Sequence, residues 1–437
     1  MGNARKAALT ALEKCRRMDA WSDAVLGSVM DSERLSGPDR GLAAALCYGV
    51  MQNRMLLDAL ISRFSTVPLS KIEPKVLDIL RISAYQLVFL DRIPASAAVN
   101  EAVKLCKAQS AGRAAGFVNA VLRKISAGDR TLPEGNGEEA LSLRFSHPLW
   151  LVRLYLERLG PDETEQLLRA QNGVTPACLQ VNSLRSDADA LTEKLQSRGL
   201  SPTRHPFLSD CLLLVHPGAI TEIPEFSDGL FYVQDAAAKL AVLAAEPKPG
   251  QRILDCCAAP GGKSFAAAIL SGGAVILSCD LHENKLKRIR DGAERLRLDC
   301  ISTRAMDARF FAPELKEQFD LVLADVPCSG LGVIRKKPDI RDKDPERFAD
   351  LPGIQAAILE NVSRYVAPGG TLLYSTCTVR REENEAVASA FLAAHPDFSA
   401  EDFVLPGGLE SSGGMLQLWP HRHGTDGFFI CKMRKQH

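Results

Sequence analysis

The chain has 437 residues, which suggests two or three domains, and its hydrophobic content of 46% is enough to fill several cores. Lys and Arg together number 53, as do Asp and Glu, so the chain has no net positive charge that would indicate RNA binding. Any RNA-binding surface must therefore be local. The twelve cysteines are scattered and form no C-x-x-C pair, which argues against a disulfide scaffold. The charged N-terminal segment argues against a secretory leader, and the lack of a ~20-residue apolar run argues against a membrane span. We therefore expect a cytoplasmic protein with no membrane association.

Residues 1–128 are predicted to form an all-helical domain. Apolar residues recur at spacings of three and four, for example at Leu42, Leu46 and Val50. Prolines separate the expected helices, where a missing amide hydrogen costs little; they are Pro68, Pro74 and Pro94. On composition alone this is a helical packing module.

Three segments of this domain, at residues 92–94, 99–103 and 116–124, resemble the NusB-type antitermination fold. The resemblance implies RNA binding. The basic side chains that could line a phosphate-contacting face are Lys104, Lys107, Arg113, Arg123 and Lys124. As charges on helices, they fit a solvated face equally well.

Two further regions precede the C-terminal domain. Residues 129–145 are predicted to be a linker, because Gly and Pro occur there among acidic residues without a hydrophobic period. Residues 146–230 are predicted to form a small α+β domain, with strand-like segments at 178–182 and 211–215 and a helix-like segment at 188–198. Such a domain resembles the one that precedes the catalytic core of RNA cytosine methyltransferases, although a plain spacer would show a similar pattern.

Residues 231–437 alternate strand and helix, which predicts a Rossmann-like domain whose parallel sheet has helices on both faces. The helix after the second strand carries Leu286, Ile289, Ala293 and Leu296 on one face, as a helix covering a sheet should. In such folds ligands bind beyond the carboxyl ends of the strands. The strands are expected at residues 252–255, 274–279, 301–305, 319–324, 371–377 and 426–431.

The first of these strands leads into a glycine turn and then a helix, over residues 252–264. Glycines let backbone amides approach a ligand closely, and the helix N-terminus behind them favours acceptor groups. The spacing matches neither G-x-G-x-x-G nor G-x-x-x-x-G-K-[ST], so S-adenosylmethionine is favoured over a dinucleotide or a triphosphate. Asp280 ends the second strand, where a carboxylate can accept both ribose hydroxyls of a nucleoside.

Acidic or thiol residues stand at the ends of the next strands: Asp307, Asp325, Cys328 and Cys377. Singly, each is weak evidence, because an Asp is often a helix cap and a Cys a small buried hydrophobe. Together they match a specific chemistry. Methylation of cytosine carbon 5 needs a thiolate to add at carbon 6, an acid at nitrogen 3 and a base for the carbon 5 proton. Two cysteines and one carboxylate can supply these groups.

Four motifs of the C-terminal domain resemble those of the bacterial 16S ribosomal RNA cytosine-C5 methyltransferases of the Sun or Fmu type, and the resemblance covers nearly the whole chain. The motifs lie at residues 257–263, 325–330, 335–340 and 375–378. The resemblance implies that Cys377 is the nucleophile, that Cys328 assists product release and that Asp325 belongs to the catalytic centre. The residues that it implies for binding S-adenosylmethionine are Cys257, Ala258, Ala259, Pro260, Gly261, Gly262, Lys263, Asp280, Asp307 and Asp325.

The expected function is therefore methylation of carbon 5 of a cytosine in 16S ribosomal RNA, by a monomer that needs no metal. Two alternatives stay open. One is a transfer-RNA cytosine methyltransferase of the same superfamily. The other is a non-catalytic RNA-binding or antitermination factor, against which the retained Cys328, Cys377 and Asp325 argue.

Three further features carry two interpretations each. His421 and His423 could suggest a metal site but lack a third ligand at a suitable spacing, which favours ordinary loop residues. The basic run at residues 335–337 is expected to contact RNA phosphate rather than only solvent. Asp235 stands in a motif that resembles a family motif near the site, and it could instead cap the Ala-rich helix that follows.

Overall fold

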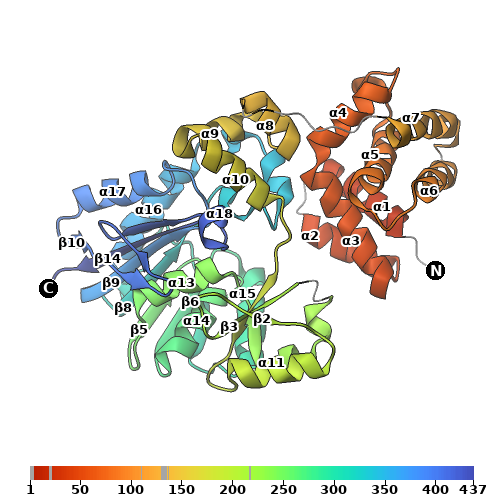
Figure 1. Cartoon of the computed structure of the whole chain (residues 1–437). Coiled ribbons are helices and arrows are strands. Elements are labelled where there is room, and N and C mark those ends of the chain that lie inside the picture. The colour runs from red at the N-terminus through yellow and green to blue at the C-terminus, as the bar shows by residue number, and fades with distance from the viewer. Residues whose placement is uncertain (1–3, 19–21, 110, 129–134, 136, 216–217) are drawn as a thin grey trace. The chain divides into compact units, whose positions relative to one another are not determined.

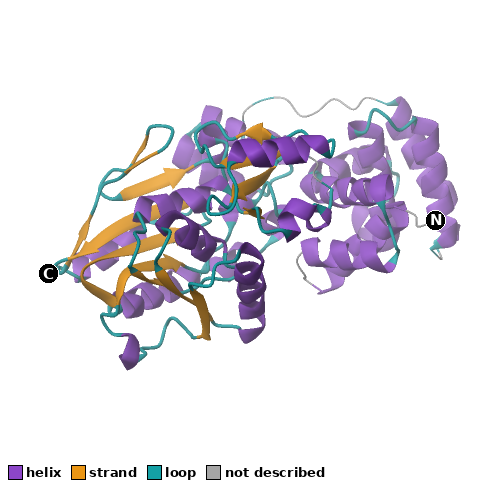
Figure 2. Ribbon diagram, turned by 90° about the horizontal axis from the view of Figure 1, so that it is seen from below, coloured by secondary structure: helices purple, strands orange, loops and turns teal. Residues whose placement is uncertain are grey.

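The computed structural model describes residues 4–18, 22–109, 111–128, 135, 137–215 and 218–437. The chain divides into two compact units. The first comprises residues 1–173 together with residues 336–343, and the second comprises residues 174–335 and 344–437. In the described part of the chain all strands belong to the second unit, as the colouring of Figure 2 makes visible.

The first unit is helical, as its periodicity predicts. Pro74 occupies the first turn of α5 and Pro94 immediately precedes α6, two places where proline is tolerated. Apolar side chains of the helices at its N-terminal end share one core, which includes Leu46, Val50 and Val121. The helices are α1 (Ala4–Met18), α2 (Ser22–Ser32), α3 (Gly37–Gln52), α4 (Arg54–Phe64), α5 (Pro74–Phe89), α6 (Ala95–Ala108), α7 (Ala115–Ala127), α8 (Glu138–Phe145), α9 (Leu149–Leu159) and α10 (Pro161–Gln171).

The end of the expected linker is helical. Glu138–Phe145 forms α8, whose first turn holds two glutamates that suit a helix N-terminus and whose Leu141 and Phe145 are buried. Residues 129–134 and 136 of the expected linker lie outside the described part of the chain. The segment expected to open the small domain, α9 and α10, belongs to the helical unit.

The buried Arg341 anchors residues 336–343, the segment that interrupts the second unit in the sequence but belongs to the helical unit. Arg341 ends the short 3₁₀ helix η6 (Pro338–Asp342), and its guanidinium donates to the carbonyl oxygens of Gln52 (3.0 Å) and Ser146 (3.2 Å) and to Asn172 Oδ1 (3.1 Å). Burial lowers the pKa of Arg341 to about 10. The segment is thus held by charge-assisted hydrogen bonds to three separate stretches of the helical unit.

The second unit begins with a small antiparallel sheet in the order β2-β3-β1-β4. One face packs Leu179, Val181 and Leu212 with Leu191 and Leu195 of α11. The other face joins the core beneath α13. The elements are β1 (Ala177–Val181), α11 (Ala188–Ser197), β2 (Thr203–Arg204), β3 (Cys211–Leu214), α12 (Pro224–Ser227), β4 (Phe231–Val233) and α13 (Ala236–Ala245).

The large sheet has the order β10-β14-β9-β8-β5-β6-β7, with β13 paired to β14. Strands β5 to β9 are parallel, as predicted. The prediction of a wholly parallel sheet was wrong, because β14 runs antiparallel to β9, β10 and β13. The strands are β5 (Arg252–Asp255), β6 (Val275–Asp280), β7 (Ile301–Ala305), β8 (Phe319–Asp325), β9 (Val366–Thr376), β10 (Phe398–Ala400), β13 (Met415–Leu418) and β14 (Phe428–Lys435).

Helices cover both faces of this sheet, as Figure 1 shows. Successive residues of a strand point to opposite faces. Ile253 of β5 therefore packs in the core with α13, α14 (Gly262–Ser271) and α15 (Glu283–Leu296), whereas Leu254 packs in the core with α16 (Leu351–Ser363) and α17 (Glu385–Ala394). The apolar face predicted for α15 is confirmed, since Leu286, Ile289, Ala293 and Leu296 are all buried.

Candidate active site

The carboxyl ends of strands β5 to β9 lie along one edge of the large sheet. Because β8 pairs with both β5 and β9, the glycine loop after β5, the Asp325–Cys328 turn after β8 and Cys377 after β9 are neighbours there. Asp280 ends β6, and Asp307 follows β7 further along the same edge. The topology thus gathers the predicted residues at this edge.

Two thiols meet at the centre of this edge. Cys328 Sγ and Cys377 Sγ lie 3.3 Å apart, although 49 residues separate them in the sequence, and both cysteines are free and half-buried. The hydrogen bond to Cys377 and burial raise the pKa of Cys328, and so do the negative charges of Glu383 and Asp325. Cys328 is therefore a protonated thiol at neutral pH, able to donate a hydrogen bond to the neighbouring sulfur.

A partly buried ion pair stands beside the thiols. Lys263 Nζ of α14 lies 2.6 Å from Asp325 Oδ2, and Ser375 Oγ of β9 donates to Asp325 Oδ1 over 3.0 Å. Burial opposes the charge on Lys263, but the negative charges of Asp325, Asp255 and Cys377 outweigh it and raise the lysine pKa. The ammonium group is thus retained next to the thiols.

The glycine loop is shaped for the close approach of a ligand. Gly261 has φ +110°, which few other residues adopt, and a Cβ there would lie 2.6 Å from the ring of Phe265. A Cβ on Gly262 would lie 2.7 Å from Gln234 Nε2. Any side chain at these two positions would therefore push against its neighbours. Backbone amide groups are left to line the start of α14, as acceptor groups of a ligand require.

A buried carboxylate with spare acceptor capacity lies behind this loop. Asp255 ends β5, is fully buried and accepts a hydrogen bond from Ser264 Oγ at 2.7 Å, while its Oδ1 has no partner among the described residues. Burial raises the pKa of Asp255 to about 6, and the charges of Asp325 and Asp280 act in the same direction. An unpartnered buried oxygen and a cramped glycine loop fit the amino and carboxylate groups of an amino-acid-like ligand.

Asp280 and Asp307 have local partners of their own. Asp280 Oδ1 accepts from the backbone amide of His282 at 3.0 Å and lies 3.7 Å from Lys285 Nζ. Asp307 forms an ion pair of 2.6 Å with Arg309, whose hydrogen bonds lower the pKa of Asp307. Of the two, Asp280 is the more buried and stands on the strand next to the glycine loop. Their role in cofactor binding stays a prediction.

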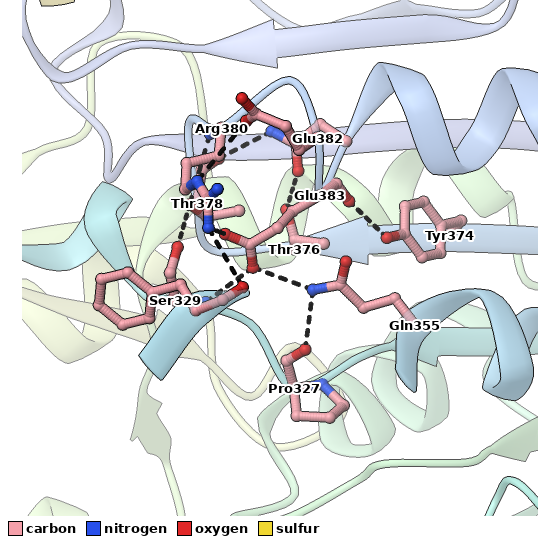
Figure 3. Close-up of polar contacts among 11 residues, drawn as sticks. Pro327, Ser329, Gln355, Tyr374, Thr376, Thr378, Arg380, Glu382 and Glu383 are labelled. Carbon is pink, nitrogen blue, oxygen red and sulfur yellow. Dashed lines mark hydrogen bonds and ion pairs between the residues drawn. The ribbon is translucent and has the colours of Figure 1, made fainter. Parts of the chain in front are cut away.

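Sequence reasoning missed the polar residues that hold the two cysteine loops, and Figure 3 shows them. Glu383 is fully buried, and its carboxylate accepts from the backbone amide of Ser329 and from Gln355 Nε2. Asn384 contacts residues on either side of Cys377. The run of charged and amide residues directly after the Thr-Cys-Thr motif, residues 380–384, was the signal available in the sequence.

The expectation that Arg335 contacts RNA phosphate was wrong. Its guanidinium pairs with Asp426 at 2.8 Å and with Asp235 at 3.0 Å, and its side chain is 9% exposed. The local run of three basic residues gave no hint of these two distant carboxylates. Asp235 also caps α13 by accepting from the amide of Ala237 at 2.9 Å, so the helix-cap interpretation of this residue is confirmed.

Two negative findings concern the described residues. They contain no group of three or more His, Cys, Asp or Glu side chains that could hold a metal ion. His423 Nδ1 accepts a hydrogen bond from the amide of Trp419 at 2.8 Å. None of the helices in the described ranges is long and apolar enough to cross a membrane.

Comparison with known proteins assigns a family to each part of the chain. Residues 242–434 match the family model described as 16S rRNA methyltransferase RsmB/F. Residues 2–127 match the NusB family, and residues 147–221 match the ferredoxin-like domain of RsmF/B-like methyltransferases.

Similar proteins agree with these matches over the full length. The probable ribosomal RNA small subunit methyltransferase B of Bacillus subtilis is 39% identical, with 99% of this chain and 98% of that protein covered. Ribosomal RNA small subunit methyltransferase B of Klebsiella pneumoniae is 34% identical over 92% of both chains. The crystal structure of PH0851 superposes with a TM-score of 0.83 at 26% identity and covers 99% of this chain and 98% of that one. The chain therefore belongs to the RsmB/F family of S-adenosylmethionine-dependent 16S ribosomal RNA methyltransferases.

Proposed function

We propose that the protein methylates carbon 5 of a cytosine in 16S ribosomal RNA through a covalent bond between Cys377 and the base. The observation that carries the proposal is the pair of thiols 3.3 Å apart, beside a lysine–aspartate ion pair, at the edge of the sheet where the glycine loop lies. Methylation at nitrogen or oxygen has no need for two adjacent thiols. Carbon 5 needs at least one, because it becomes nucleophilic only after a thiolate has added to carbon 6.

The unequal environments of the two thiols support Cys377 as the attacking group. Cys328 has a raised pKa and keeps its proton, so it is a poor nucleophile in the free enzyme. Cys377 has the hydrogen-bonding thiol of Cys328 on one side and lies within the field of the Lys263 ammonium group. A hydrogen-bond donor and a cation near the Cys377 sulfur suit it to the attacking role. This environment supports the division of labour that the family resemblance implies.

The reaction can be followed through the protein groups. A bond forms between Cys377 Sγ and carbon 6, and the Lys263–Asp325 pair lies beside it to balance the charge that develops on the ring towards nitrogen 3. S-adenosylmethionine supplies an electrophilic methyl group to carbon 5. The carbon 5 proton then passes to a water molecule acting as base, and the electron pair of the broken carbon–hydrogen bond restores the double bond between carbons 5 and 6. The bond from carbon 6 to sulfur breaks with its electron pair leaving as the Cys377 thiolate. The Cys328 thiol, 3.3 Å from the departing sulfur, is placed to stabilise the thiolate by a hydrogen bond.

The same edge of the sheet is proposed to bind S-adenosylmethionine. The glycine loop from Cys257 to Lys263 would contact the methionine part, and Asp280 would accept the ribose hydroxyls. Asp307 stands further along the edge, on β7 beside β6. The fit rests on the absence of room for side chains at Gly261 and Gly262 and on the unpartnered Oδ1 of Asp255 within the described residues. Lys263 and Asp325, which the resemblance also implies for cofactor binding, bind each other at the same edge.

The helical unit is proposed to contribute to RNA binding. Lys104, Lys107 and Asn119 line an open hollow of about 550 Å³ between α6 and α7. Lys104 also forms an ion pair of 2.8 Å with Glu101, so part of its charge is balanced locally. An enzyme acting on ribosomal RNA is expected in the cytoplasm, and action as a monomer stays a prediction.

One experiment separates the proposal from its nearest alternative. S-adenosylmethionine labelled in the methyl group is offered with deproteinised 16S RNA, intact small subunits and transfer RNA as competing acceptors. Label at carbon 5 of cytosine in 16S RNA or in the subunit supports the proposal. Label mainly in transfer RNA would show that transfer RNA is the substrate instead. Label on nitrogen or oxygen would refute the cysteine mechanism.

A further inference from the structure

Two consecutive residues in the turn between β9 and α17 each hold one of the two cysteine loops. The first, Glu383, is fully buried. Its Oε2 accepts the backbone amide of Ser329 at 2.8 Å and Gln355 Nε2 at 3.0 Å. Gln355 Nε2 also donates to the carbonyl oxygen of Pro327 at 3.0 Å. The residues before and after Cys328 are thus both fixed by Glu383 and the amide that it orients, as Figure 3 shows.

The second residue, Asn384, forms hydrogen bonds to the residues before and after Cys377. Its Oδ1 accepts from Thr376 Oγ1 at 2.5 Å, and its Nδ2 donates to the carbonyl oxygen of Thr378 at 3.1 Å. A hydrogen bond of 2.7 Å between Ser329 Oγ and Thr378 Oγ1 then joins the residues that follow the two cysteines. The two cysteine loops are therefore hydrogen-bonded to each other as well as to the turn.

The turn itself is tied back to the strand that ends at the nucleophile. Tyr374 Oη of β9 donates to the carbonyl oxygen of Glu383 at 2.6 Å, and the amide of Glu383 donates to the carbonyl oxygen of Arg380 at 3.2 Å. The Arg380 guanidinium stands 3.5 Å from Glu383 Oε1, a long contact for an ion pair. A carboxylate this deeply buried is costly, and only part of its charge is balanced by Arg380.

We propose that Glu383 is a positioning residue that holds the Cys328 thiol beside Cys377, with Asn384 holding the opposite side of the pair. The proposal deepens the proposed function and rests on it for the chemistry, because the separation of the two sulfurs matters only where both take part. An acceptor at the position of Oε2 fixes both neighbours of Cys328. Loss of that acceptor frees the loop on one side of the reacting sulfur while leaving Cys377 attached to Asn384.

The separation of the thiols can be tested without RNA. Dibromobimane joins two nearby thiols as each sulfur displaces one bromide, and peptide mass spectrometry of the full-length protein identifies the pair joined. We expect joining of Cys328 to Cys377 in the wild type at an alkaline pH that ionises part of the Cys328 thiol, and all variants are compared at that pH. Glu383→Leu, which removes both acceptors at similar volume, should slow it at least about tenfold. Glu383→Gln keeps a carbonyl acceptor and should restore most of the rate. Glu382→Gln removes the adjacent, exposed carboxylate and serves as the matched control.

A second test measures adduct formation and turnover with RNA. Glu383→Leu should reproduce the effect of Cys328→Ala: the first methyl transfer continues, the protein–RNA adduct accumulates, and steady turnover falls by about 100-fold, the order expected for a reacting group displaced by 1 Å. Glu383→Gln should release the adduct at close to the wild-type rate. A purely structural role would instead lower adduct formation in Glu383→Leu and leave nothing to accumulate.

The two proposals fail in different ways. If neither the wild type nor Cys328→Ala forms an adduct, the covalent mechanism is wrong, and the joining rates still decide whether Glu383 sets the distance between the sulfurs. If Glu383→Leu joins its thiols as fast as the wild type, or Glu383→Gln is as slow as Glu383→Leu, positioning by the acceptor is refuted. Should Glu383→Leu not fold, Gln355→Leu removes the donor that joins Pro327 to Glu383 and keeps the direct bond from Ser329, and an unchanged joining rate in that variant refutes the proposal.

Discussion

Ser264 Oγ donates to Asp255 Oδ2 over 2.7 Å, and within the described residues this is the one hydrogen bond that the fully buried carboxylate of Asp255 accepts. Burial raises the pKa of Asp255 to about 6 from the usual 3.8. A carboxylate with a raised pKa stabilises the fold while it is protonated. That contribution is complete below pH 4 and is lost as the pH rises through about 6.

Asp255→Asn should therefore be more stable relative to the wild type at pH 7.5 than at pH 4.5. The difference in free energy of unfolding should grow by about 2 kcal/mol across this range. Urea unfolding at several pH values measures it, and Asp291→Asn, at an exposed carboxylate of α15, is the control. A difference that does not change with pH would mean that Asp255 titrates at its ordinary value.

Asp280→Ala should weaken S-adenosylmethionine binding, because the ribose hydroxyls would lose their acceptors. Hydrogen bonds to a charged group contribute about 1–3 kcal/mol, which corresponds to a loss of roughly ten- to hundredfold in affinity. Calorimetric titration measures it. The fold should survive, since Asp280 stands at the end of a strand and its internal partners are the His282 amide and Lys285. An unchanged affinity would remove Asp280 from the cofactor site.

The sequence predicted those parts of the fold that depend on local pattern. Strands β5 and β8 are short apolar runs between turns, and α15 shows its buried face as a plain period of three and four. The direction of β14 could not be predicted in this way. A buried apolar run looks the same whichever way the strand runs, and its direction is set by pairing with β9 and β13.

In the site, too, features that depend on neighbouring residues could be predicted, and contacts between distant residues could not. Asp325, Cys328 and Cys377 follow strands directly, so their meeting could be expected once the strands were recognised. Arg335 could not be assigned correctly, because its partners Asp235 and Asp426 are 100 and 91 residues away. Hydrogen bonds between such distant residues leave no periodic trace in a single sequence.

Arg341→Met should destabilise the helical unit. The substitution keeps most of the buried volume but leaves the carbonyl oxygens of Gln52 and Ser146 and the side chain of Asn172 without their charged donor. A buried acceptor left without a donor costs about 1–3 kcal/mol. Hydrogen exchange of α3 and α8 would show it as faster opening. Lys337→Met, at an exposed position of the same segment, is the control, and equal exchange in the two variants would contradict the anchoring role.

The division of labour between the two thiols gives the most specific prediction. Cys377→Ala should abolish both methyl transfer and any covalent RNA adduct, because carbon 5 stays a poor nucleophile without the attacking sulfur. Cys328→Ala should behave differently. Cys377 can still add and the methyl group can still transfer, but the departing thiolate has lost a hydrogen-bond donor 3.3 Å away, so the adduct should accumulate.

A denaturing gel with labelled RNA distinguishes the outcomes, because a covalent adduct migrates more slowly than free RNA and survives denaturation. Cys431→Ala, which removes a buried thiol on β14 away from the strand ends, controls for the general effect of losing a cysteine. If Cys328→Ala turns over normally and leaves no adduct, Cys328 is only a packed thiol behind Pro327. If the trapped species appears with Cys377→Ala and is missing with Cys328→Ala, the two sulfurs act in the opposite order. The raised pKa of Cys328 argues against that order, since attack would then require a thiol that holds its proton more tightly than an ordinary cysteine to ionise first.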